Sequence, residues 1–75
     1  MRKGVKTLNY PNLRAEMART GVSTTRLAES TGLSLATAYR RINEGNFSFE
    51  EAERIRNELF PECTVDYLFD GGEGA

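Results

Sequence analysis

The stretch GVSTTRLAESTGLSLATAYRRINEG, residues 21–45, decides the fold of this chain. It predicts two short helices joined by a tight turn, the first over residues 24–30 and the second over residues 35–43. Ser23 and Ser34 stand where these helices would begin, and a serine hydroxyl there accepts a hydrogen bond from a free backbone N–H group. This order of elements is typical of a helix-turn-helix, which carries its second helix into the major groove of DNA.

Small and apolar residues within the stretch agree with this interpretation. Gly32 can take the positive φ that the turn demands. Ala28 is small where two helices must cross closely, and Leu27 lies beside it on the inward face. In the second helix Ala38 and Ile42 are four positions apart, so both are expected to point inward.

A further helix is predicted before this stretch. It would span about residues 11–19, where Tyr10, Leu13 and Met17 recur at three- and four-residue intervals on one face. The residues before it, 1–9, are expected to form a flexible basic arm.

Two more helices are predicted after the stretch. Ser48 and Glu51 form a capping box, which predicts a helix that ends near residue 59. A last turn or two is expected over residues 65–69, and residues 70–75 are expected to be a disordered tail. The core stripe of the longer helix would comprise Phe49, Ala52, Ile55 and Leu59. The chain is therefore predicted to be all-α, with one domain over residues 10–69.

Composition excludes several kinds of site. The chain of 75 residues has no histidine, which rules out a histidine-based metal site and a Ser–His or Cys–His catalytic pair. The single cysteine, Cys63, cannot form an internal disulfide and is most simply a buried small hydrophobe. No apolar run is long enough to span a membrane and no signal peptide is visible, so a cytoplasmic protein is expected.

Charge is divided unevenly along the chain, although the net charge is only −1. Residues 1–45 carry eight Lys or Arg against three Asp or Glu, a net charge of +5. Residues 46–75 carry two against eight, a net charge of −6. Phosphate is attracted by the local field of a surface rather than by the total charge of the chain. Charge runs on helices are often only solvated faces, but here the basic half coincides with the predicted helix-turn-helix.

A family resemblance extends over most of the chain. It is carried by NLRAEMARTGVSTTRLAESTGLSLATAYRRINEG at residues 12–45, FSFEEAERIRNELFP at residues 47–61 and CTVDYLF at residues 63–69. These segments resemble the phage repressor and Cro-type helix-turn-helix domains of the XRE family. The resemblance implies a compact five-helix, lambda-repressor-like domain that binds double-stranded DNA.

The resemblance also implies where DNA would be contacted. In the family the first residue of the second helix meets a phosphate or a base edge, and here that position is Thr24, which could also serve only as a helix start. Glutamine is frequent there, but this chain contains none, so adenine reading by a Gln amide is excluded. The candidate DNA-binding residues are Thr24, Thr25, Ser34, Leu35, Ala36, Thr37, Tyr39, Arg40, Arg41, Asn43 and Asn46.

Several of these residues have two interpretations. Arg40 is the best candidate, because a guanidinium matches guanine O6 and N7 or a phosphate bidentately, but it could be a solvated surface arginine. Arg41 would meet a phosphate or an acidic neighbour, and Ala36 could touch a thymine methyl, as could the neighbouring threonine. Core packing is slightly favoured over DNA contact for Leu35. Tyr39 could bond a phosphate or cover the edge of the core.

Phosphate contacts are also expected from the backbone. Free N–H groups at the starts of the second and fourth helices, and in the Gly45–Asn46 loop, could donate to phosphate oxygens. Weaker candidates are the side chains of Arg2, Lys3, Lys6 and Arg14.

The apolar C-terminal segment has two interpretations. Val65, Leu68 and Phe69 could close the core, or part of this cluster could join Tyr67 in the two-fold contact of a homodimer. A repressor-like dimer would bind a palindromic operator with half-sites about 10 base pairs apart.

The leading hypothesis is a sequence-specific transcriptional regulator, of the kind encoded as a small phage or prophage repressor. The alternative is a protein-interaction module on the same fold, such as an antirepressor or an antitoxin-like partner. An enzyme is not expected, because the carboxylates lie on predicted solvent-facing positions without a cleft. No cofactor and no metal are implied.

Overall fold

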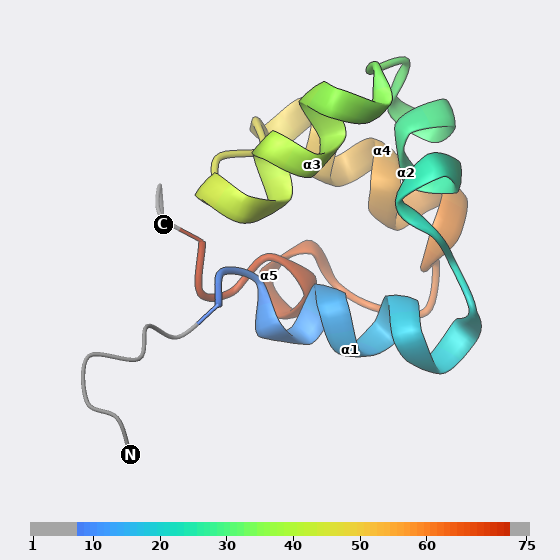
Figure 1. Cartoon of the computed structure of the whole chain (residues 1–75). Coiled ribbons are helices and arrows are strands. Elements are labelled where there is room, and N and C mark those ends of the chain that lie inside the picture. The colour runs from blue at the N-terminus through green and yellow to red at the C-terminus, as the bar shows by residue number, and fades with distance from the viewer. Residues whose placement is uncertain (1–7, 73–75) are drawn as a thin grey trace.

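In the computed structural model, which describes residues 8–72, five helices follow one another along the chain (Figure 1). They are α1 (Pro11–Thr20), α2 (Thr24–Thr31), α3 (Leu35–Glu44), α4 (Phe49–Leu59) and α5 (Val65–Leu68). The all-α prediction is confirmed for this part of the chain. None of these helices is long and apolar enough to cross a bilayer.

Side-chain caps define where the helices begin, as the sequence predicts. The hydroxyls of Ser23 and Ser34 each accept a hydrogen bond of 3.1 Å from the backbone N–H three residues later. The capping box of α4 is complete: Ser48 Oγ accepts from Glu51 N at 3.1 Å, and Ser48 N donates to Glu51 Oε1 at 3.0 Å. Gly32 follows α2 with a φ of 73°, as the tight turn requires.

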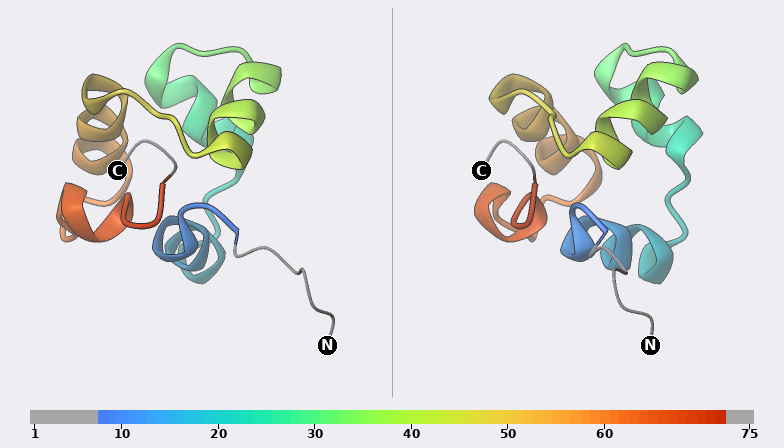
Figure 2. Two further views of the ribbon diagram at one scale, coloured as in Figure 1. Left: turned by 90° about the vertical axis from the view of Figure 1, so that its left-hand side faces the viewer. Right: turned by 60° about the vertical axis from the view of Figure 1, so that its left-hand side comes forward.

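The helices form two groups that enclose one core. α2 packs against both α3 and α4, whereas α5 packs against α1 and α4 (Figures 1 and 2). α3 lies in front of α4 in Figure 1, and α1 and α5 lie side by side below them. The buried core consists of Tyr10, Leu13, Met17, Leu27, Ala28, Ala38, Ile42, Ile55, Phe60 and Leu68.

An aromatic cluster joins the start of α1 to the second half of the chain. The ring of Tyr10 is 5.7 Å from that of Phe47 and 5.2 Å from that of Phe69, measured between centroids. The Tyr10 hydroxyl accepts a hydrogen bond of 2.9 Å from Phe47 N. Burial raises the pKa of this phenol above its ordinary value. Tyr10 adopts a φ of 55°, a conformation that costs a non-glycine residue about 1 kcal/mol, so its contacts must outweigh that strain.

Two apolar residues are more exposed than the sequence predicts. Phe49, expected in the core stripe of α4, is 67 % exposed, and Leu35, for which core packing was favoured, is 43 % exposed. Both occupy the first position of a helix, and helical side chains lean toward the N-terminus, so each extends beyond its helix and away from the core. Phe60, just after α4, is buried at 4 % exposure and packs in the core. Cys63, expected to be buried, is half-buried against the core.

The ends of the domain meet beside Tyr10. Gly72 lies against its ring, so closely that a Cβ on this glycine would be 2.4 Å from Tyr10 Cε1. Leu68 is fully buried and Phe69 packs against the core, which confirms the core interpretation of the C-terminal segment for these two residues. Residues 1–7 of the predicted arm and 73–75 of the predicted tail lie outside the described residues.

Candidate nucleic-acid interface

The outward face of α3 collects five of the predicted site residues. Positions three and four residues apart are neighbours on a helix surface, and the pair that faces the core of this helix, Ala38 and Ile42, is buried. The exposed residues of the outward face are Leu35, Ala36, Tyr39, Arg40 and Asn43. The face thus combines apolar groups, a phenol, an amide and a cation.

The two adjacent arginines of α3 lie in different environments. Arg40 is exposed and has no hydrogen-bond or ion-pair partner within residues 8–72. Arg41 is half-buried against Glu51 of α4: its Nη2 donates to Oε2 at 3.3 Å, and its Nε lies 3.2 Å from Oε1 without being aligned for a hydrogen bond. Of the two predicted roles for Arg41, the structure therefore shows the acidic neighbour. Of these two arginines, Arg40 is the one whose guanidinium is open to a ligand in the described part of the chain.

Two of the predicted site residues, Ser34 and Thr37, bond to each other at the N-terminus of α3. Ser34 Oγ accepts from Thr37 N at 3.1 Å and donates to Thr37 Oγ1 at 2.9 Å. The serine hydroxyl therefore uses its hydrogen within the cap, whereas the threonine hydroxyl can still donate a hydrogen bond to a ligand. Ser34 is exposed and Thr37 is half-buried at this end of α3.

A hollow of about 340 Å³ brings Thr24 together with the outward face of α3. Thr24 is the first residue of α2, and the hollow places it near Tyr39 and Asn43, with Met17 and Ile42 of the core among the lining residues. The three predicted site residues thus surround one depression, although they come from two helices.

Arg14, predicted as a weaker phosphate contact, lines the same hollow and fixes the end of α3. Its Nε donates to Asn9 O at 2.7 Å, and its Nη2 lies 3.4 Å from both Ile42 O and Asn43 Oδ1. Asn9 Nδ2 in turn donates to Asn43 O at 2.8 Å. Arg14 and Asn9 are positioning residues that spacing alone did not reveal, because their contacts reach across about 30 positions of sequence.

The first turns of the helices differ in charge. α2 and α3 have no acidic residue in the first turn, and the N–H groups of Thr24 and Thr25 have no acceptor among the described residues. α4 instead begins with Glu50 and Glu51. A helix N-terminus attracts anions, and a side-chain carboxylate near it satisfies that field internally. Of the two helix starts predicted to meet phosphate, the first turn of α2 fits the role and that of α4 does not.

The Gly45–Asn46 loop does not offer the free backbone donors that were expected. Gly45 N and Asn46 N both point to Arg41 O, at 2.9 and 3.2 Å, and so complete the end of α3. The Asn46 amide donates to Glu44 Oε1 at 3.2 Å. Asn46 is exposed, but its backbone N–H and one N–H of its side-chain amide already have acceptors within the protein.

One cation near this surface was not among the predicted residues. Arg26, in the first turn of α2, is exposed and has no hydrogen-bonding side-chain partner in residues 8–72. Its position directly after the Ser23 cap and two threonines is the signal that could have found it, because a cation beside free N–H groups reinforces a phosphate site.

No family model matches the chain, and neither a curated protein nor a solved structure matches it. In the described part of the chain, no three His, Cys, Asp or Glu side chains are grouped to hold a metal ion. The arrangement of α2 and α3 therefore carries the functional argument.

Proposed function

We propose that this chain is a sequence-specific DNA-binding regulator of transcription, in which α2, the turn and α3 act as a helix-turn-helix. The observation that carries the proposal is the outward face of α3, where Arg40 projects without a partner among the described residues. A helix of this diameter fits the major groove of DNA, and a guanidinium there reads guanine through O6 and N7. The chain would block or recruit polymerase by occupancy, without chemistry.

The neighbouring groups suit the remaining contacts. Leu35 and Ala36 can pack against thymine methyl groups, and Tyr39 and Asn43 can bond base edges or phosphates at the far end of the helix. The N–H groups at the start of α2 would hold one phosphate and so fix the orientation of α3. Resemblance to phage repressors supports a homodimer on a palindromic operator, acting in the cytoplasm.

The test begins with selection of bound sequences from random DNA duplexes, followed by titration of the selected duplex. Arg40→Glu should lower its affinity roughly 100-fold, because a good base contact contributes about 1–3 kcal/mol and the new carboxylate repels DNA. Wild-type affinity should also fall about 100-fold between 50 and 200 mM salt, as about four phosphate contacts predict.

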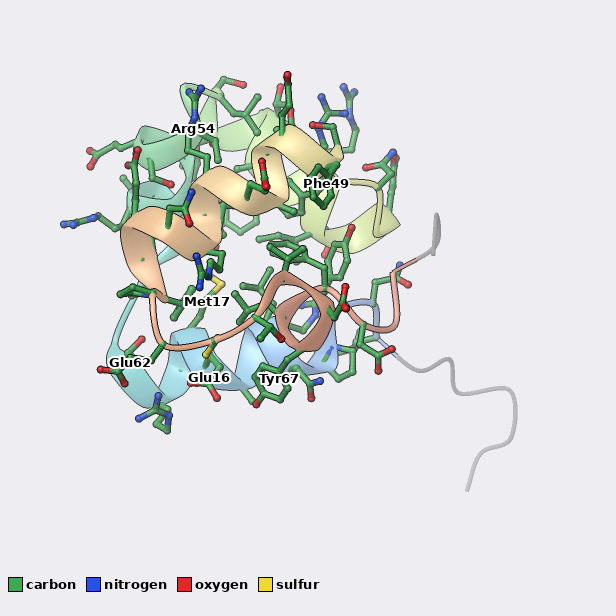
Figure 3. All side chains as sticks on the ribbon, turned by 180° about the vertical axis from the view of Figure 1, so that it is seen from behind. Glu16, Met17, Phe49, Arg54, Glu62 and Tyr67 are labelled. Atoms are coloured by element: carbon green, nitrogen blue, oxygen red, sulfur yellow. The ribbon has the colours of Figure 1, made fainter. Side chains whose placement is uncertain are left out.

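Arg54→Glu is the matched control. Arg54 is also exposed and without a partner among residues 8–72, but it lies on α4 (Figure 3). It has the same charge change and should leave affinity within about threefold of wild type, since it removes no base contact. Equal losses in the two variants, or selection of no sequence, would overturn the assignment of α3.

A further inference from the structure

A second surface lies between the start of α4 and α5, among residues that the proposed DNA contact does not use. A cavity of about 460 Å³ opens there. Phe47 and Phe69 of the aromatic cluster line it, together with Ala52 and Val65. Binding pockets for small ligands measure about 300–1,000 Å³, so this volume accommodates one or two inserted side chains.

Phe49 stands at the edge of this cavity with its ring in water. It is 67 % exposed, the highest value among the large apolar residues of the described chain, and it is the first residue of α4 (Figure 3). Covering such a ring removes a large apolar surface from water and so favours binding. The α4 cap does not need this ring, because Ser48 and Glu51 supply its hydrogen bonds. The ring is therefore available to a partner.

The rim of the cavity is acidic. Asp66 and Asp70 both line it, and neither forms an ion pair within residues 8–72. No Lys or Arg of the described residues lines this cavity, and Glu50 and Glu53 are exposed on the adjoining helix. An apolar cavity with such a rim attracts cations and repels phosphate, which excludes DNA and anionic lipid as its ligand.

We propose that this groove, formed by Phe49, Val65 and Phe69 and bordered by Asp66 and Asp70, docks a segment of a partner protein. The segment carries one or two large apolar side chains flanked by Lys or Arg. The apolar groups cover Phe49 and enter the cavity, and the cations pair with the two aspartates. Charge complementarity selects this occupant. The DNA contact on α3 is separate, so the chain could hold DNA and a protein together.

A library of random 12-residue peptides displayed on phage tests this proposal against the immobilised full chain. Enriched peptides should combine Phe, Leu or Trp with Lys or Arg. A synthetic copy of the best peptide should bind Phe49→Ala at least tenfold more weakly than wild type. An Asp66→Asn, Asp70→Asn double variant should bind it about three- to tenfold more weakly at low salt, and this difference should shrink as salt screens the charges.

Leu35→Ala is the matched control, because Leu35 is also an exposed apolar residue at the first position of a helix. This variant should bind the peptide as wild type does. Phe49→Ala, in turn, should retain DNA affinity and the wild-type circular dichroism spectrum, since the ring is mostly in water. Loss of peptide binding with unchanged DNA binding would show that the groove and the proposed DNA contact are independent. Either proposal can therefore fail without the other.

Four results would overturn the proposal. They are the absence of any enriched sequence, enrichment of acidic peptides, equal peptide affinity of wild type and Phe49→Ala, and equal loss in Leu35→Ala. Two further results would also overturn it, because they would identify another occupant. A wild-type dimer that becomes monomeric in Phe49→Ala would make a second copy the occupant. Peptide affinity that rises tenfold on replacing Arg2, Lys3 and Lys6 by serine would make the chain's own N-terminal segment the occupant.

Discussion

The helices α2 and α3 begin in the same way as α4 and α5, yet the first turns of the two pairs differ in charge. All four start at a Ser or Thr whose hydroxyl accepts a hydrogen bond from the backbone. After the cap, α2 and α3 have no acid in the first turn, whereas α4 has Glu50 and Glu51 and α5 has Asp66. The cap decides where a helix begins, and the residues after it decide which charge the helix end attracts.

The same division is visible in the exposed apolar residues. Leu35 and Phe49 both occupy the first position of a helix and both lean out of the core. Leu35 lies on the same helix as Arg40, whose guanidinium has no partner among residues 8–72, and both are proposed to face DNA. Phe49 lines the same cavity as Asp66 and Asp70, the groove proposed to bind a cationic peptide. In the two proposals, therefore, the first position of a helix serves two different surfaces, and the charged residues of each surface distinguish them.

The largest effect is expected where the two regions share a core. Tyr10→Ala removes a ring that contacts Phe47 and Phe69 and leaves a cavity, so it should lower the free energy of unfolding by about 3–5 kcal/mol. Tyr10→Phe keeps the ring and loses only the bond from Phe47 N, which should cost about 1 kcal/mol. Urea unfolding followed by circular dichroism measures both.

Both regions should lose stability together in Tyr10→Ala, in a single transition. A variant whose α2 and α3 amides stay protected from hydrogen exchange while those of α4 and α5 exchange would show that the two regions fold separately. That result would weaken the comparison, because the charge division would then coincide with two folding units.

An intermediate effect is expected from making α2 begin like α4. Thr25→Glu places a carboxylate in the first turn, where it should stabilise the helix by about 0.3–1 kcal/mol. The same carboxylate would occupy the field that is proposed to attract phosphate, so DNA affinity should fall roughly tenfold, about 1.4 kcal/mol. Titration of the selected duplex and thermal unfolding measure the two opposite changes.

The reverse change is its control. Glu50→Thr gives α4 a first turn with one acid fewer, and DNA affinity should stay within about twofold of wild type, because α4 is not proposed to meet DNA. If Thr25→Glu bound DNA as well as wild type does, the start of α2 would have no phosphate role, whatever the role of α3.

The helices could be predicted because their signals are local. The surfaces could be predicted only in part, because they depend on how the helices pack. Caps, glycine stops and apolar spacing act within a few residues, so the predicted helix bounds agree with those observed to within one residue. Phe49 was misassigned because spacing specifies a face of a helix but not whether the helix end reaches the core. The Arg14–Asn43 and Arg41–Glu51 contacts join different helices, and only the packing of those helices brings them together.

The smallest effect is expected at a surface contact between α1 and α5, outside the first turns compared above. Glu16 of α1 accepts a hydrogen bond of 2.9 Å from the Tyr67 hydroxyl of α5 and pairs with Arg19 at 2.6 Å (Figure 3). The bond from Arg19, and then that from Tyr67, lowers the pKa of the Glu16 carboxyl below its ordinary value. The ionised form is thus favoured by folding. Its contribution is present above the unfolded pKa and is lost as pH falls through the folded one.

Glu16→Gln removes this pH dependence and keeps a hydrogen-bond acceptor. The variant should unfold at a slightly lower temperature than wild type at pH 7, and the difference should shrink as pH falls from 7 to 3, because the wild-type carboxyl takes up a proton as pH falls through its lowered pKa. Thermal unfolding at the two pH values measures this. The contact is exposed to solvent, so salt should also reduce the difference at pH 7. A difference that stays constant from pH 7 to pH 3 would mean that α1 and α5 are held by packing and by the Asn12 bond to Tyr67 O alone.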